Sequence, residues 1–244
     1  MAEKIFVTSG KGGVGKSTIC ALLGATLARL DKKTLIIELD FGLRSLDVML
    51  GVSDKTVFDL SDVLMSRCEI NKEIVSCEYE PRLKLISAPL DSFLSYNKES
   101  LKKLLDKIDG EYDYILIDSP AGAGLSFREA ISLVDSALIV VTPDLVCVRD
   151  ARKVSDILLD FGVTNQRLII NKVKNKFMKL DILTDLDYVI DAVGVQLISV
   201  IPENIEIFQK TLVGSSLIKE SVSFKVFENL AKRILGQEIP LIIK

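Results

Sequence analysis

A glycine-rich loop near the start of the chain limits the folds that this sequence can adopt. It lies between a short apolar run and a helical pattern and reads Thr8-Ser9-Gly10-Lys11-Gly12-Gly13-Val14-Gly15-Lys16-Ser17-Thr18. Glycines at these positions let successive backbone N–H groups turn toward a phosphate, and the helix N-terminus adds the positive end of its dipole. Lys16 is placed to reach the β- and γ-phosphates, and the Ser17 hydroxyl to complete the coordination of Mg²⁺. The predicted nucleotide-binding residues of the loop are Gly10, Lys11, Gly12, Gly13, Val14, Gly15, Lys16, Ser17 and Thr18.

The same loop also fits the pattern of a dinucleotide site, G-x-G-x-x-G. Glu38 lies roughly 20 residues further on, where that fold places the acid that binds a ribose. A dinucleotide loop, however, needs small apolar residues after its last glycine so that helix and strand can approach. This chain has Lys16 and Ser17 there. We therefore favour a triphosphate over a dinucleotide, and over a glycine-rich turn without a ligand.

Composition excludes several kinds of chemistry. The 244-residue chain has no histidine, which rules out histidine triads, imidazole metal sites and histidine general bases. Four scattered cysteines, without a C-x-x-C pair, favour free thiols over a zinc or iron–sulfur site. A net charge of −3 offers no general attraction to nucleic acid. Because no signal peptide or membrane span is recognisable, we expect a cytoplasmic protein.

Short apolar runs alternate with amphipathic stretches along the chain. The predicted strands are Ile5–Thr8, Thr34–Glu38, Leu83–Ser87, Tyr114–Asp118, Ser136–Thr142, Arg167–Asn171 and Gln196–Ile201. The predicted helices are Ser17–Leu30, Lys98–Asp109, Phe127–Leu133, Val148–Phe161, Thr184–Val193, Ile205–Leu212 and Ser223–Leu235. Near-continuous apolar strands are typical of parallel sheets, so we expect an α/β fold with one doubly wound, mostly parallel sheet and helices on both faces. No linker interrupts the pattern, and residues 1–244 are predicted to form a single domain.

Three further charged residues are candidates for the chemistry. Asp40 follows the second predicted strand, where a carboxylate can orient an attacking water and help to hold hydrated Mg²⁺; a helix cap is the alternative. Asp118 ends an apolar strand, and burying a lone carboxylate is costly unless a cation lies opposite. Lys11 occupies a free position of the loop pattern. It is either a solvated lysine or the source of the extra positive charge that phosphoryl transfer requires.

These residues together resemble the deviant Walker A ATPases of the MinD/ParA group, whose loop carries a second lysine where Lys11 stands. The resemblance covers nearly the whole chain. It rests on Gly10–Thr18, Asp40–Asp47, Asp118–Gly122, Pro143 with Val148–Asp150, Asn171–Lys172 and Ile201–Glu203. Within the group, Leu43–Asp47 and Asp118–Gly122 indicate the MinD branch.

The resemblance implies an ATPase that forms a homodimer around ATP and Mg²⁺, releases ADP, and regulates where the division septum is placed. It implies that Lys11, Lys16 and Asp40 are catalytic, with Lys11 reaching the phosphates of the partner subunit. It implies Ser17, Asp40 and Asp118 around the metal, and Asn171, Pro202 and Glu203 at adenine. Without it, Asn171 would be a turn residue and Pro202 a strand stop. Regulatory partners of the MinC and MinE kind are also implied, and Arg149 and Asp150 are expected to start a helix near the dimer interface.

The sequence departs from the group at three places. Glu38 stands where the group usually has aspartate, and Ser45 where the MinD branch usually has asparagine. The branch normally ends in a basic amphipathic helix that binds membranes. Here Phe224–Leu235 is predicted to dock on the sheet and to be capped by Gly236, which leaves Gln237–Lys244 too short for another helix. We therefore do not expect membrane association, with a peripheral position at the inner face of the membrane as the alternative.

Other functions of the group stay open. A DNA-segregation ATPase of the ParA type would need a basic face, so we expect no nucleic-acid partner. An ATPase that positions flagella or other polar structures is not separated from the septum function by the sequence. An enzyme that activates a carboxylate is a further alternative. Iron–sulfur relatives are disfavoured because no cysteine lies near Asp118 in the sequence and none are paired.

Overall fold

The computed structural model describes residues 1–91, 94–120, 122–174 and 186–241. In the described residues one sheet has the strand order β3-β4-β2-β5-β1-β6-β7-β8. All neighbouring strands pair in parallel except β3 and β4, so the predicted doubly wound, mostly parallel sheet is confirmed. The strands are β1 (Glu3–Thr8), β2 (Thr34–Glu38), β3 (Val75–Ser76), β4 (Leu83–Ile86), β5 (Tyr114–Asp118), β6 (Ser136–Val141), β7 (Gln166–Val173) and β8 (Leu197–Pro202).

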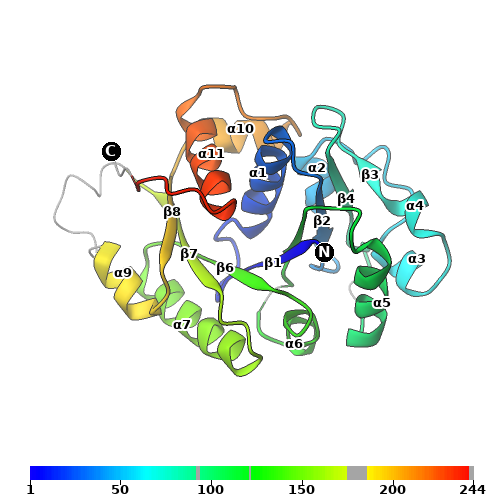
Figure 1. The fold of residues 1–244 in the computed structure, drawn as a ribbon, viewed down its shortest axis with the longest axis horizontal. Coiled ribbons are helices and arrows are strands. Elements are labelled where there is room, and N and C mark those ends of the chain that lie inside the picture. The colour runs from blue at the N-terminus through cyan, green and yellow to red at the C-terminus, as the bar shows by residue number, and fades with distance from the viewer. Residues whose placement is uncertain (92–93, 121, 175–185, 242–244) are drawn as a thin grey trace.

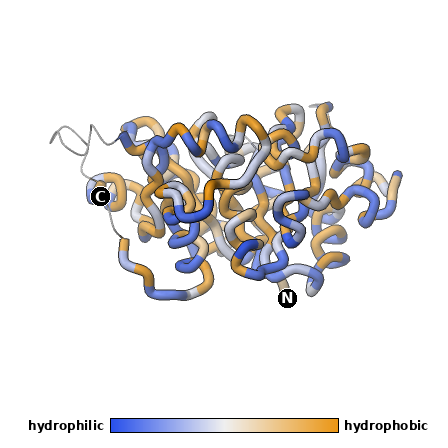
Figure 2. The backbone as a smooth tube through the Cα atoms, turned by 90° about the horizontal axis from the view of Figure 1, so that it is seen from above, coloured by the Kyte–Doolittle hydropathy of each residue, from blue (hydrophilic) through white to orange (hydrophobic). Residues whose placement is uncertain are grey.

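Helices cover both faces of this sheet (Figure 1). They are α1 (Lys16–Arg29), α2 (Leu46–Met49), α3 (Leu60–Leu64), α4 (Ile70–Glu73), α5 (Lys98–Ile108), α6 (Leu125–Ile131), α7 (Leu145–Asp160), α9 (Leu186–Val193), α10 (Ile205–Leu212) and α11 (Val222–Ile234). Helices α1 and α11 lie on one face, with α6 and α7 on the other. Every residue of β2 and β6 is buried, which explains why the interiors of these strands are apolar. Along the outer helices, hydrophobic and hydrophilic residues alternate (Figure 2).

Helix α11 docks as predicted. Phe227, Leu230 and Ala231 are fully buried, and the helix packs against α1 and β8. The guanidinium of Arg29 lies 5.3 Å from the ring centroid of Phe224, which adds a cation–π contact between α11 and α1. Gly236 follows the helix with a φ of 80°, a left-handed conformation that glycine adopts without strain. Among the helices that the structure describes, none is long and apolar enough to span a bilayer.

The structure differs from the sequence prediction in its short elements. Strand β3 and helices α2, α3 and α4 were not predicted, because segments of two to five residues carry too little periodicity. Helix α7 begins at Leu145, three residues before the predicted start, and Asp144 caps it by accepting a hydrogen bond from the backbone N–H of Cys147. Arg149 and Asp150 therefore lie in the second turn of α7, and the expectation that they start it is wrong. Residues 184–185 of a predicted helix lie outside the described residues.

Glu73 is a buried carboxyl group at the end of α4. Its side chain is 1 % exposed, and within the described chain neither oxygen has a hydrogen-bond partner. Burial, reinforced by the negative charges of Asp59 and Asp62, raises the pKa of Glu73 to about 8. The group therefore stays protonated in the folded protein at neutral pH, while the unfolded chain releases its proton near pH 4.5.

This difference predicts a pH-dependent stability. Between pH 4.5 and about 8 only the unfolded state has lost the proton, so Glu73 makes the free energy of unfolding fall as pH rises. The slope from this one group is about 1.4 kcal/mol per pH unit. Glu73→Gln, which cannot ionise, should be more stable than the wild type at pH 8 by a few kcal/mol and similar to it at pH 5. Urea unfolding at both pH values measures this, with the exposed Glu69→Gln as the matched control. Equal stability of wild type and Glu73→Gln at pH 8 would contradict it.

Candidate nucleotide site

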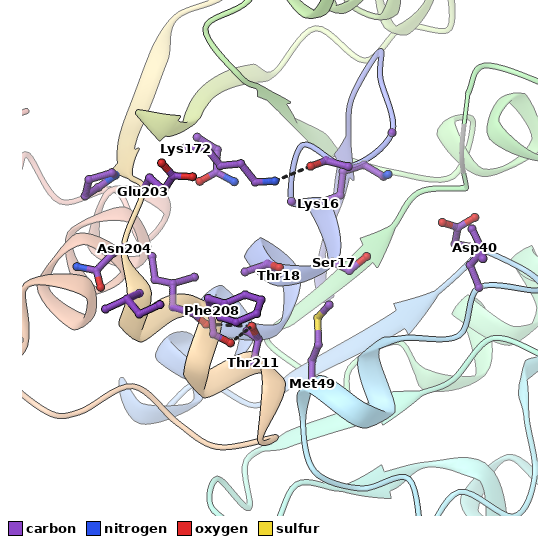
Figure 3. Close-up of a pocket in the computed structure, with 18 residues that line it drawn as sticks. Lys16, Ser17, Thr18, Asp40, Met49, Lys172, Glu203, Asn204, Phe208 and Thr211 are labelled. Atoms are coloured by element: carbon purple, nitrogen blue, oxygen red, sulfur yellow. Dashed lines mark hydrogen bonds between the residues drawn. The ribbon is translucent and has the colours of Figure 1, made fainter. Parts of the chain in front are cut away.

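The glycine-rich loop lies at the carboxyl end of β1. Later strands of the chain lie on both sides of β1 in the sheet, with β5 as its neighbour on one side and β6 on the other, so the strand order changes direction here. In doubly wound sheets this is the place where ligands bind. A cavity of about 750 Å³ opens here (Figure 3). The predicted site residues that line it are Gly12, Gly13, Gly15, Lys16, Ser17, Thr18, Asp40, Asn171, Pro202 and Glu203. Residues from four distant parts of the chain are thus brought together around one space.

Two glycines of the loop lie so close to neighbouring residues that a Cβ would not fit. Gly15 has a φ of 102°, and a Cβ there would lie 2.5 Å from Nδ2 of Asn171. Gly10 lies against α7, and a Cβ there would lie 2.4 Å from the backbone carbon of Asp150. Behind the loop, the side chain of Lys16 is almost buried. The loop therefore curls tightly over the start of α1, as a phosphate-binding loop does.

Ser17 and Asp118 meet beside the loop. The Ser17 hydroxyl donates a hydrogen bond of 2.6 Å to Oδ2 of Asp118, whose other oxygen is buried without a partner in the described structure. Burial raises the pKa of Asp118 to about 6, although the hydrogen bond from Ser17 and the charge of Lys16 act in the opposite direction. A hydrated cation would satisfy the unpaired oxygen. In the described chain no three acidic or cysteine side chains could hold a metal by themselves, so this arrangement fits Mg²⁺ that arrives with phosphates.

Eight further residues that line the cavity were not predicted as site residues. They are Leu43, Met49, Lys172, Asn204, Ile205, Ile207, Phe208 and Thr211. Half of them lie in α10, and Asn204 is the N-cap of that helix. The side chains of Ile205 and Phe208 are 68 % and 61 % exposed, so an apolar surface faces the cavity without being part of the core. Figure 3 shows Phe208 and Met49 near Thr18. Such a surface suits the flat face of a base.

Comparison with known proteins gives the family. The profile of the ParA family, described as the NUBPL iron-transfer P-loop NTPase, matches residues 1–235. The septum site-determining protein MinD of Synechocystis is 39 % identical over 246 residues, which cover 99 % of this chain and 92 % of the relative. This chain is a MinD-type member of the ParA family of P-loop NTPases.

Solved structures agree with this assignment. The MinC:MinD cell division protein complex of Aquifex aeolicus superimposes with a TM-score of 0.92, at 35 % identity and 99 % coverage of both chains. The MinD protein of Pyrococcus horikoshii in complex with Mg-ADP gives a TM-score of 0.85, at 28 % identity and 96 % coverage of both chains.

Lys11, the second lysine of this ParA-family loop, does not line the cavity of its own chain. Its ammonium lies 3.4 Å from Oδ1 of Asp144, the residue that caps α7, and both side chains are partly exposed. Although burial acts in the opposite direction, hydrogen bonds from Thr142 and Cys147 and the charge of Lys11 lower the pKa of Asp144. Lys16 and Lys11 therefore have different surroundings: one is enclosed in the site, and the other is directed toward the surface.

Glu38 fixes the segment that carries Asp40. One oxygen accepts hydrogen bonds from the backbone N–H groups of Ser45 at 2.7 Å and Leu46 at 3.1 Å. The other accepts from the N–H of Ala88 at 3.3 Å. Burial raises the pKa of Glu38 to about 7, although these hydrogen bonds lower it. Glu38 thus connects the start of α2 with the ends of β2 and β4. It thereby holds both ends of the segment between Glu38 and Ser45, which carries Asp40.

Asp118 has a cysteine beside it in the structure, although none lies near it in the sequence. Cys20, one turn into α1, is fully buried beside Asp118, and the negative charge of Asp118 adds to burial in raising the pKa of the Cys20 thiol. The separation in sequence concealed this contact. Cys20, Cys77 and Cys147 are buried, Cys68 is half-buried, and none forms a disulfide. The description of the family profile mentions iron transfer; among the described residues, no group of three or more cysteine, aspartate or glutamate side chains could hold a metal ion.

Proposed function

We propose that this chain is an ATP-hydrolysing switch of the MinD type that regulates where the division septum is placed. ATP closes two chains into a dimer, and hydrolysis opens it. This proposal rests on one observation: the same phosphate loop carries an enclosed lysine, Lys16, and a lysine directed toward the surface, Lys11. The enclosed lysine can serve its own nucleotide, and the outward one can exchange its contact with Asp144 for a nucleotide in a second chain. Similarity to septum site-determining MinD proteins over 99 % of the chain supports the cellular role.

Each residue of the site then has a part in hydrolysis. Lys16 and the loop amides hold the phosphates, and the cavity wall of α10, with Asn171, Pro202 and Glu203, receives the adenine. Ser17 and Asp118 would hold Mg²⁺ in the site, and the hydrogen bond between them keeps the Ser17 hydroxyl in place for this role. When bound, Mg²⁺ neutralises charge that develops on the phosphates. Asp40 orients the attacking water, and Lys11 of the second subunit adds positive charge to the transition state.

The proposal includes the protein partners. The structure of similar fold from Aquifex aeolicus is a complex of MinC with MinD. We propose that partners of the MinC and MinE kind bind the ATP-bound dimer of this chain, and that residues 1–244 act as one ATPase domain.

One comparison tests the switch. The purified protein should be a monomer with ADP and a dimer with ATP and Mg²⁺ by light scattering, and should release phosphate from ATP. In the source organism, loss of the protein should misplace division septa. Misplaced flagella would point to the polarity alternative, and lost DNA, with ATP-dependent DNA binding that falls steeply with salt, to a segregation ATPase.

Asp40→Ala should separate dimerisation from hydrolysis. Without its carboxylate the attacking water is not oriented, so phosphate release should fall about a hundredfold. ATP binding is left intact, and the dimer should accumulate under saturating ATP. Light scattering and phosphate release on the same sample measure both effects. A purely monomeric Asp40→Ala variant under saturating ATP would count against this role.

A further inference from the structure

Strand β7 carries one extra residue immediately before its end. Ile170 pairs with Val200, but the next pair joins Val173 to Pro202, so two residues of β7 stand opposite one of β8. The second of these two residues, Lys172, has a φ of 56°. The other described non-glycine residues with positive φ are Asp31, Ser66 and Glu220, and all three lie in turns. A strained residue inside a strand persists only where other interactions hold it, and bulges of this kind often re-aim side chains next to functional sites.

The bulge changes where two side chains point. In a regular strand, consecutive side chains project to opposite faces. Here Asn171 and Lys172 both reach the phosphate loop. Nδ2 of Asn171 donates a hydrogen bond of 2.7 Å to the carbonyl of Val14, and Nζ of Lys172 donates one of 2.7 Å to the carbonyl of Gly13. Figure 3 shows the Lys172 side chain extended from the end of β7 toward the loop.

These two contacts orient the peptide groups of the loop. A peptide unit is planar and trans, so its C=O and N–H point in opposite directions. Holding the Gly13 carbonyl toward Lys172 therefore directs the N–H of Val14 the other way, away from β7. Holding the Val14 carbonyl toward Asn171 does the same for the N–H of Gly15. A phosphate-binding loop needs its N–H groups to converge before the anion arrives, because reorienting them on binding would reduce affinity.

The geometry points to Lys172 as a positioning residue of the phosphate site, one that sets the direction of the Gly13–Val14 peptide and so prepares the loop for the phosphates of a nucleotide. This inference rests on the proposed function, since it assigns Lys172 a part in the same site. Lys172 acts through the loop and not as a further charge on the γ-phosphate. Lys172 should therefore contribute equally to the affinity for ADP and to the affinity for ATP.

Three variants of Lys172 separate this role from a purely structural one. Lys172→Met keeps the length of the side chain but loses the donor, and should weaken both ADP and ATP binding by about tenfold, or about 1.4 kcal/mol. Lys172→Arg keeps a donor and should stay within about threefold of the wild type. Lys172→Gly relieves the backbone strain and should be at least as stable as the wild type, yet bind nucleotide as weakly as Lys172→Met. The control is Lys102→Met on α5, an exposed lysine paired with Asp106, which should bind like the wild type.

Titration calorimetry with ADP and with the non-hydrolysable ATP analogue AMPPNP measures these affinities, and thermal unfolding measures stability. Amide hydrogen exchange at Val14 and Gly15 should be faster in nucleotide-free Lys172→Met than in nucleotide-free wild type. Binding by Lys172→Met within twofold of the wild type, or unchanged exchange, would overturn the inference. A loss of affinity that is larger for AMPPNP than for ADP would also overturn it, because it would indicate that Lys172 contacts the γ-phosphate directly. Failure of the proposed function would appear instead in the wild type, as absent hydrolysis or absent ATP-dependent dimers.

Discussion

Replacing Lys16 with alanine should remove nucleotide binding while leaving the fold intact. The Lys16 side chain is almost buried at the floor of the loop and lines the cavity where the phosphates are proposed to lie. Truncating one partner of a buried charge pair costs about 2–5 kcal/mol, which corresponds to about a thirtyfold to several-thousandfold loss of affinity. Because ADP and ATP would both lose this contact, both titrations should become unmeasurable at micromolar protein. Calorimetry with each nucleotide provides the measurement.

The fold of the Lys16→Ala variant must be checked independently. Removing a buried charge that lies near Asp118 changes the electrostatics of a buried carboxylate that has one unpaired oxygen in the described structure, so the thermal unfolding midpoint should be recorded with the titrations. Lys102→Ala, which removes an exposed charge, serves as the control. Tight ATP binding by a folded Lys16→Ala protein would remove the assignment of this loop as the phosphate site.

Replacing Lys11 with alanine should spare nucleotide binding and abolish hydrolysis. Lys11 is paired with Asp144 at the start of α7 and does not line its own cavity, so the affinity of the monomer for ADP should stay near the wild-type value. Hydrolysis should fall about a thousandfold, the lower end of what an added transition-state cation contributes to phosphoryl transfer. ATP-dependent dimers should also be lost. Phosphate release and light scattering test both expectations, and unchanged turnover would contradict the cross-subunit role.

A mixing experiment distinguishes action within one subunit from action across two. In a mixed dimer, the Lys11→Ala subunit keeps its own Asp40 and would receive Lys11 from an Asp40→Ala partner, which gives one complete site. An equimolar mixture should therefore regain phosphate release well above that of either variant alone, up to about a quarter of the wild-type rate if the subunits pair at random, because each mixed dimer has one complete site of two. If Lys11 acted within its own chain, no site in the mixture would be complete, and the rate would stay at that of the separate variants.

The sequence predicted those parts of the fold and site that depend on local pattern. The apolar strands and long amphipathic helices produce strong periodicity, so their positions agree with the structure to within a few residues at each end. Lys16 and Ser17 follow from the loop pattern, and Asp118 from its place at the end of a buried strand. Short elements such as α3 and β3 lack enough residues for a period to emerge.

The missed parts of the site depend on distant contacts. Phe208 and Ile205 belong to an ordinary amphipathic helix in the sequence, and only the packing of α10 places them at the cavity. Lys172 follows a predicted strand end, and no sequence pattern reports its positive φ or the extra residue in β7. Cys20 and Asp118 are close only because α1 packs against β5. Such juxtapositions come from tertiary structure, which local periodicity does not encode.

The glycines of the phosphate loop are under different constraints, although a motif treats them as equivalent. Gly13 and Gly15 are required by their dihedral angles, which lie in the left-handed region. Gly10 is required by the backbone of α7, which leaves no room for a methyl group, whereas a Cβ at Gly12 would meet no atom of the chain. If a substitution at Gly10 inactivates the protein in a genetic screen, the cause would be displacement of α7. The loss of a phosphate contact would be the wrong explanation. The tolerance of Gly12 would in turn measure how closely a ligand or a second subunit approaches the loop.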